Sequence, residues 1–185
     1  MTKIVSILLL ICLFPIFAIV ALAIIIDDGF PLYFRQKRIG INNNEFWIYK
    51  FRTMKNETPD IPTHLVKEKQ KYNTVIGPIL RKLSIDELPQ LINILKGEMS
   101  IVGPRPERPY FIEKLNKEYP FYQRRLKIRP GITGWAQIKQ PFDTTVKDVR
   151  QKLKYDFYYI QNLSFRLDVK IIINTIWVVF WGHSR

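Results

Sequence analysis

The sequence predicts an α+β protein that is mostly helical, with an N-terminal membrane helix, a small β-hairpin and several short or amphipathic helices packed at the membrane interface. Three observations carry this prediction: an uncharged apolar segment at residues 4–26, two runs of aromatic and β-branched residues separated by a turn, and apolar residues at helical spacing further along. A chain of 185 residues holds one compact domain besides a membrane element. We therefore divide it into an anchor over residues 1–30 and a second domain over residues 31–185.

The apolar segment is long enough to cross a bilayer. As a helix it would extend about 34 Å, against about 30 Å for a hydrocarbon core. A cleaved signal peptide would be shorter and would end at small residues, whereas Asp27 and Asp28 follow here. Pro15 lies in the middle of the segment and removes one helical hydrogen bond, so we expect a break or kink there.

Two topologies of this segment remain open, a kinked spanning helix and a helix that turns back at Pro15 to the face it entered from. Only Lys3 precedes the segment, whereas a basic stretch at residues 35–38 follows it closely. The bias of positive charge toward the cytoplasm places the second domain there in either topology.

Turn residues and strand-forming runs predict a hairpin at the start of the second domain. Residues 46–52 form a strand that pairs with the Tyr33–Phe34 region through a turn at residues 40–44. Residues 56–73 are polar and contain two prolines, which indicates a loop with room for a short helix. A short apolar and basic element follows at residues 79–83.

Helical periodicity accounts for the rest of the chain. Leu88, Leu91, Ile92 and Leu95 lie on one helix face, and Gly97 ends that helix.

Three further helices are predicted toward the C-terminus. Residues 110–125 form a helix with aromatic side chains on one face, and residues 145–160 form a highly charged one. Residues 169–181 are apolar and aromatic but, at 13 residues, too short to span a bilayer. They form either a core helix or a helix lying in the membrane interface with its tryptophans at headgroup level.

Composition favours an anionic partner. Lys and Arg number 29 against 16 Asp and Glu, for a net charge of +13, which suits a lipid surface, a nucleotide, a phosphate or nucleic acid, or simply aids solubility. The cations recur from Arg35 to Arg129 rather than in one tail, which argues against a disordered nucleic-acid arm. Cys12 is the single cysteine, so no intramolecular disulfide forms, and with only two histidines a zinc site is not indicated.

Asp86 and Glu87 are the candidate catalytic residues. A structural role competes, because Ser84 and Glu87 have capping-box spacing and acids favour the first turn of a helix. Pro89 fits the first turn better with Asp86 as the cap.

Two rigid loops follow the acid pair. Residues 103–106 (Gly-Pro-Arg-Pro) hold Arg105 between two prolines, and an arginine fork matches phosphate oxygens. Taken alone, such a loop more often is a turn with a surface arginine. Residues 130–134 (Pro-Gly-Ile-Thr-Gly) bring backbone amides to an anion or serve as a tight connector.

Six segments form an ordered series of motifs: KFRTM (50–54), LSIDELPQ (83–90), GEMSIVGPRPE (97–107), RPGITGWAQ (129–137), YDFYYI (155–160) and LDVK (167–170). In residue identity, order and spacing these motifs resemble those of the bacterial sugar transferases, the monotopic phosphoglycosyl transferases that start lipid-linked glycan assembly. The resemblance covers nearly the whole chain and matches the small members, which consist of the catalytic core alone.

The resemblance implies transfer of a sugar 1-phosphate from a UDP-sugar to undecaprenyl phosphate, with release of UMP and with Mg²⁺ as cofactor. The reaction would be the first membrane step of exopolysaccharide, capsule or lipopolysaccharide synthesis, at the cytoplasmic face of the inner membrane. The expected partners are membrane lipid and other glycan-assembly enzymes, and not nucleic acid. The anchor over residues 1–30 would be a re-entrant helix broken at Pro15, and residues 31–185 the catalytic domain.

The resemblance also assigns roles to residues. Asp86 is the nucleophile of a two-step transfer through an aspartyl phosphosugar intermediate, and Glu87 completes the catalytic pair. The expected phosphate or nucleotide contacts are Lys50, Arg52, Arg81 and Arg105. The candidate metal ligands are Asp86, Glu87 and Asp168.

Two departures from the family pattern bear on these expectations. The family's anchor breaks at a Ser-Pro pair, whereas this chain has Phe14-Pro15, so the serine that helps satisfy freed backbone groups is missing. Many small members carry Asn-Gly-Arg after the last of the rigid loops, where this chain has residues 139–143 (Lys-Gln-Pro-Phe-Asp), as in the exopolysaccharide and capsule branch. A sugar-contact role of that arginine does not carry over.

Two rival functions fit part of the pattern. A non-catalytic, membrane-anchored basic protein that binds anionic lipid or nucleic acid fits the charge and the anchor but has no use for buried acids. A multi-pass lipid phosphotransferase fits the chemistry, but a single long apolar segment argues against it.

Overall fold

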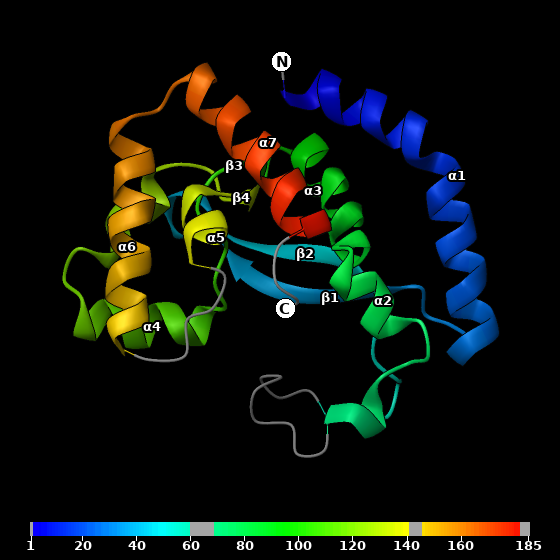
Figure 1. Cartoon of the computed structure of the whole chain (residues 1–185). Coiled ribbons are helices and arrows are strands. Elements are labelled where there is room, and N and C mark those ends of the chain that lie inside the picture. Colours follow the sequence, from blue (N-terminus) through cyan, green and yellow to red (C-terminus); the bar gives the residue numbers. More distant parts are fainter. Residues whose placement is uncertain (1, 60–68, 141–145, 182–185) are drawn as a thin grey trace.

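The computed structural model describes residues 2–59, 69–140 and 146–181, and it is mostly helical with two small sheets (Figure 1). The α-helices are α1 (Thr2–Asp28), α2 (Gly77–Lys82), α3 (Leu91–Lys96), α4 (Pro109–Glu118), α5 (Trp135–Lys139), α6 (Val146–Gln161) and α7 (Phe165–Trp181). The strands are β1 (Tyr33–Ile39), β2 (Glu45–Phe51), β3 (Ser100–Val102) and β4 (Gly131–Thr133). Short 3₁₀ helices are η1 (Ile41–Asn43), η2 (Lys69–Tyr72), η3 (Ile85–Gln90) and η4 (Tyr122–Lys127). The predicted mostly helical α+β class is confirmed.

Helix α1 runs unbroken through Pro15, so the predicted break is not an interruption of the helix. Figure 1 shows that the helix is instead strongly bent along its course over one side of the molecule. Among the described residues it is the one helix long and apolar enough to cross a membrane, and the protein covers only 11% of its most apolar stretch.

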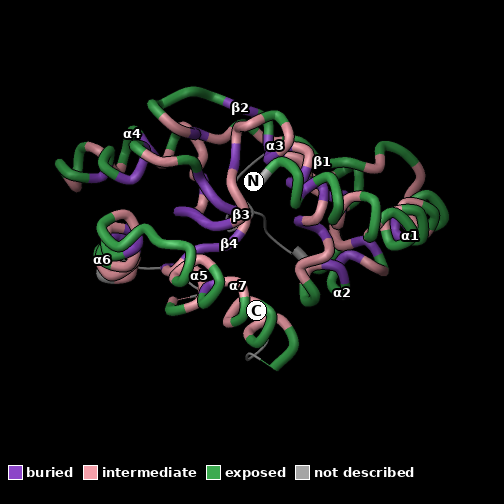
Figure 2. The backbone as a smooth tube through the Cα atoms, turned by 90° about the horizontal axis from the view of Figure 1, so that it is seen from above, coloured by how far each residue is buried: buried purple, intermediate pink, exposed green. Residues whose placement is uncertain are grey.

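One narrow stripe of α1 contacts the rest of the protein. It consists of Ser6, Leu10, Leu13, Phe17, Val20 and Ile24, which are buried or partly buried. The spacing alternates between four and three residues, so the contact is one seam along the helix. The rest of the circumference is apolar and exposed, as the green trace of α1 at the edge of Figure 2 shows.

The predicted hairpin is confirmed. Strands β1 and β2 pair antiparallel, with Tyr33 opposite Phe51 and Ile39 opposite Glu45, across the turn that contains η1. Phe46 and Ile48 point into a core shared with α3 and α1. Lys50 alternates to that same face of β2, which brings its ammonium group toward η3.

The sequence did not reveal the second sheet. Strands β3 and β4 pair in parallel, Ser100 with Gly131 and Val102 with Thr133. Gly103 and Gly131 lie so close that a Cβ on either one would collide with backbone of the other's segment. This sheet fixes the start of the 103–107 loop, and it lies with the buried trace at the centre of Figure 2.

Two of the predicted C-terminal helices, the one over residues 110–125 and the one over residues 169–181, differ from the structure. The helix expected over residues 110–125 is wrong, because α4 ends at Glu118, Pro120 follows, and the chain continues as η4. Helix α6 is confirmed, and its predicted first residue, Thr145, lies outside the described residues.

Helix α7 begins four residues earlier than expected, and one face of it belongs to the core, while the proposed place in the membrane interface stays a prediction. Ile171 is fully buried against Val102 and Tyr159, whereas Trp177 and Trp181 stack on each other and are exposed.

Candidate active site

The acid pair lies on η3, between α2 and α3, rather than at the start of an amphipathic α-helix as predicted. Ser84 precedes η3 in a left-handed conformation, with a φ of 54°, and its side chain does not cap the helix. The capping-box interpretation is therefore wrong. Asp86 and Glu87 are 7% and 6% exposed, a degree of burial that carboxylates in a merely solvated turn do not have.

Two cations bind Glu87. Lys50 donates to Glu87 Oε1 at 2.8 Å, and Arg105 donates to Oε1 at 2.8 Å and to Oε2 at 3.5 Å. Burial raises the pKa of Glu87, but Arg105 and Lys50 together outweigh burial and hold it well below its ordinary value. Glu87 is therefore a fixed anion that holds both cations in place.

The carboxylate of Asp86 has fewer partners than that of Glu87. Among the described residues its carboxylate makes one ion contact, with Lys50 Nζ at 3.6 Å. Burial raises its pKa, and Glu87 raises it further, against the opposing effects of Lys50, Arg105 and Arg81. A buried carboxylate with free lone pairs beside two cations can attack an electrophile that arrives with negative charge.

The loop at residues 103–106 directs Arg105 toward Glu87. Prolines 104 and 106 fix the backbone on either side, and the guanidinium side chain remains 35% exposed. It therefore reaches both the buried acid and the solvent from which a phosphate would come.

The structure places two predicted residues, Arg52 and Asp168, away from this cluster. The Arg52 side chain is 6% exposed, pairs with Asp28 at 2.9 Å and donates to the carbonyls of residues 28 and 29 at the end of α1. In this structure Arg52 thus holds the end of α1 and does not join the acid pair. Asp168 accepts the Tyr159 hydroxyl at 2.8 Å on α7.

Arg81 occupies an intermediate position. Its guanidinium donates to Thr53 and to Asn73, so those donors are already used. It still acts on Asp86 electrostatically.

The predicted three-acid metal set is not assembled. No group of three His, Cys, Asp or Glu side chains suited to a metal exists within residues 2–59, 69–140 and 146–181. The observed donors nevertheless fit Mg²⁺, which takes one or two carboxylates together with substrate phosphate oxygens. Asp86, with its free lone pairs, is the first ligand candidate, and Glu87 the second.

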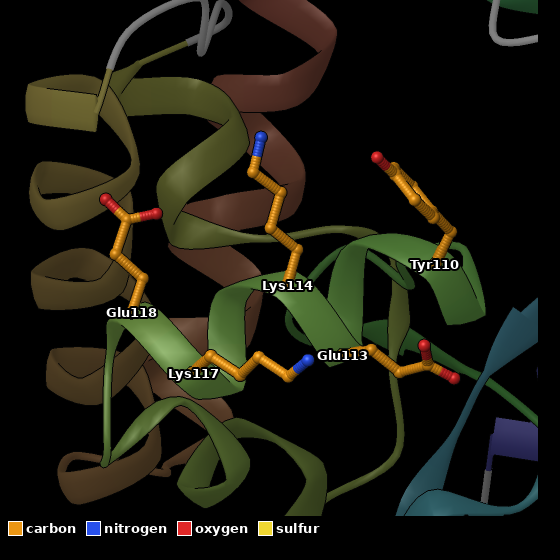
Figure 3. A pocket seen from close by; sticks show the side chains of 5 residues that line it. All are labelled: Tyr110, Glu113, Lys114, Lys117 and Glu118. Carbon is orange, nitrogen blue, oxygen red and sulfur yellow. The ribbon is translucent and has the colours of Figure 1, made fainter.

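A shallow pocket elsewhere on the surface has no part in this cluster. Its lining consists of Tyr110, Glu113, Lys114, Lys117 and Glu118, all on α4 (Figure 3). Neither Asp86 nor Glu87 lines this pocket, and nor do their ion partners Lys50 and Arg105, so the pocket adds nothing to the site.

Sequence reasoning missed the residues that hold the site in place. Asn93 is fully buried, accepts the Tyr49 amide and donates to the Trp47 carbonyl, which fixes β2 against α3. Arg125 and Glu107 form a second supporting group. Glu107 belongs to the motif that carries Arg105, but nothing in the spacing shows that Arg125 lies beside it.

The chain belongs to the bacterial sugar transferase family, whose model matches residues 1–182. It is 41% identical over 170 residues to a UDP-N-acetylgalactosamine-undecaprenyl-phosphate N-acetylgalactosaminephosphotransferase of Aeromonas hydrophila, covering 92% of this chain and 40% of that protein. It is 39% identical over 172 residues to the uncharacterized sugar transferase EpsL of Bacillus subtilis (90% of this chain, 79% of that protein). It is 36% identical over 187 residues to the exopolysaccharide production protein ExoY of Sinorhizobium fredii (93% and 80%). The chain thus spans about two fifths of the first of these relatives.

Proposed function

We propose that this chain transfers a sugar 1-phosphate from a UDP-sugar to undecaprenyl phosphate and releases UMP. The observation that carries the proposal is the buried, uncommitted carboxylate of Asp86 beside Lys50 and the Arg105–Glu87 pair. The Aeromonas relative's name supports the class of donor and acceptor. The name of the Sinorhizobium relative supports a place in exopolysaccharide production.

Transfer proceeds in two displacements at one phosphorus. A carboxylate oxygen of Asp86 forms a bond to the phosphorus that bears the sugar, and the bond from that phosphorus to the bridging oxygen breaks, so that UMP leaves with the electron pair. A phosphate oxygen of undecaprenyl phosphate then attacks the same phosphorus and releases Asp86 as a carboxylate. Lys50 and Arg105 offer N–H donors to the phosphoryl oxygens, on which negative charge gathers in both steps.

Mg²⁺, held by Asp86 and Glu87 with the diphosphate, would neutralise charge on the substrate and on the leaving UMP.

The test of this function is which nucleotide leaves. With Mg²⁺, undecaprenyl phosphate and a panel of UDP-sugars, the accepted sugar should yield UMP and lipid-linked sugar diphosphate in equal amounts, and a chelator should abolish both. Release of UDP instead would mean that the sugar alone is transferred, and the proposal would then be wrong.

We propose further that α1 is re-entrant, with both of its ends at the cytoplasmic face of the inner membrane. Support comes from its bend (Figure 1) and from Arg52, which ties the end of α1 to β2. In a Cys12→Ser background, single cysteines placed at Thr2 and at Lys37 should both resist an impermeant maleimide in intact cells and react after permeabilisation. Labelling of the residue 2 cysteine in intact cells would show that the helix spans the membrane.

A further inference from the structure

The loop that carries Arg105 is held from outside by four hydrogen bonds in a row. Its prolines have no N–H, so it cannot be fixed through those amides. Instead, four successive carbonyls each accept a donor from another element: Pro104 from Gly131 N at 3.0 Å, Arg105 from Arg125 at 2.8 Å, Pro106 from Arg38 at 2.9 Å and Glu107 from Ile39 N at 2.9 Å. Two of the four donors are side chains, and both are arginines.

The Arg125 side chain is buried and binds other groups of the protein. Its side chain is 2% exposed, and it pairs with Asp156 on α6 at 3.0 Å. It also donates to the Tyr122 hydroxyl and lies 3.6 Å from Glu107. Its charge is thus compensated within the protein, and no substrate oxygen is needed to balance it.

Glu107 extends this support across the loop. It binds Lys152 of α6 at 2.7 Å. Burial raises the pKa of Glu107, but Lys152 and Arg125 outweigh burial and lower it to about 2, so it stays charged. The far end of the loop is therefore attached to α6 through fixed charges.

The Arg105 carbonyl links this support to the site. The Arg105 carbonyl accepts a hydrogen bond from Arg125 NH2, while the Arg105 guanidinium donates to Glu87 Oε1 at 2.8 Å. Glu87 in turn holds Lys50, which lies 3.6 Å from Asp86. A shift of the Arg105 backbone therefore displaces both cations that face the attacking carboxylate, and misplacement of about 1 Å is costly in such a site.

We propose that Arg125 is a positioning residue of the transfer reaction, acting through the Arg105 carbonyl to aim the Arg105 guanidinium at Glu87 and the substrate phosphates. The proposal rests on the function proposed above. Arg38, on the next carbonyl, supports the same loop.

The first test is a double-mutant cycle on turnover. Arg125→Lys keeps the buried charge but cannot bind Asp156 and the Arg105 carbonyl with one planar fork, so turnover should fall about fivefold, equivalent to about 1 kcal/mol. In an Arg105→Ala background the same change should cost less than about twofold, because the side chain it positions is gone. A fivefold loss that persists in Arg105→Ala would show that Arg125 does not act through Arg105.

Tyr122→Phe is the matched control. It removes another hydrogen-bond partner of Arg125 from the same buried group but leaves the contact with the Arg105 carbonyl, so turnover should stay near wild type. If Arg125→Lys does not fold, the double variant Arg125→Met/Asp156→Leu replaces it, since removing both charges leaves none unpaired.

The second test does not depend on activity. In ¹⁵N-arginine-labelled protein, the Arg105 Nε–H signal, assigned by its absence from Arg105→Ala, should shift or broaden in Arg125→Lys and stay unchanged in Tyr122→Phe. An unchanged signal in Arg125→Lys would overturn the inference. A wild-type protein that transfers no sugar phosphate would instead refute the proposed function, and this signal would still decide the role of Arg125.

Discussion

Asp86→Asn should abolish turnover while the protein stays folded. The amide has the volume of the carboxylate but cannot serve as a nucleophile toward phosphorus. In the described structure Asp86 accepts no hydrogen bond and makes one ion contact at 3.6 Å, so the change disturbs little packing. If the protein were instead a non-catalytic, membrane-anchored basic protein, Asp86→Asn would bind anionic lipid normally, and the wild type itself would show no turnover.

Trapping the intermediate gives the decisive measurement. Wild-type protein incubated with labelled UDP-sugar and Mg²⁺, without lipid acceptor, should release UMP and retain label on the peptide that contains Asp86. Asp27→Asn is the matched control, because the Asp27 carboxylate accepts the Ile76 amide at 3.0 Å and an amide oxygen can replace it. If UMP appears only after undecaprenyl phosphate is added and no label stays on the protein, transfer is direct, and Asp86 is a metal ligand or a base.

Arg105→Lys should lower turnover by about tenfold or more, or about 1.4 kcal/mol in the barrier. Lysine keeps the charge but loses the fork that now contacts both oxygens of Glu87, at 2.8 and 3.5 Å. A lysine at this position could not donate the two parallel N–H hydrogen bonds that an arginine offers to a phosphate group.

The control for this change is Arg124→Lys. Arg124 is an exposed arginine whose guanidinium lies over the Phe121 ring, outside the site. Its variant should match wild type in both turnover and melting temperature. Near-normal turnover of folded Arg105→Lys would reduce Arg105 to a structural partner of Glu87.

Local patterns in the sequence predict those parts of the fold that local patterns determine. The hairpin follows from two strand-forming runs around a turn, and α6 from a charged helical period. The three-residue strands β3 and β4 carry too few residues for any periodicity, and their pairing joins positions about thirty residues apart. Close backbone contact at Gly103 and Gly131 decides that pairing, and a sequence pattern does not show it.

The candidate site was predicted in part for a similar reason. The motifs identify Asp86, Glu87 and Arg105, but no local pattern brings residue 50 beside residue 87. Strand alternation would put Lys50 and Arg52 on the same face and hence in the same site. Strand β2 ends at Phe51, however, and the Arg52 side chain turns to Asp28. The end of a strand, which sequence patterns locate poorly, therefore separates a site residue from an anchor-holding one.

The seam along α1 means that this helix cannot be removed without disturbing the rest of the protein. Leu10 and Leu13 complete the apolar cluster around Ile94, and Phe17, Val20 and Ile24 complete the one around Phe51 and Leu80. A chain that starts after residue 28 would expose both clusters to water and would leave the buried Arg52 without its carboxylate partner. Deleting the hydrophobic helix should therefore yield an aggregating polypeptide and not a soluble enzyme. Detergent or lipid belongs to the conditions under which this domain folds.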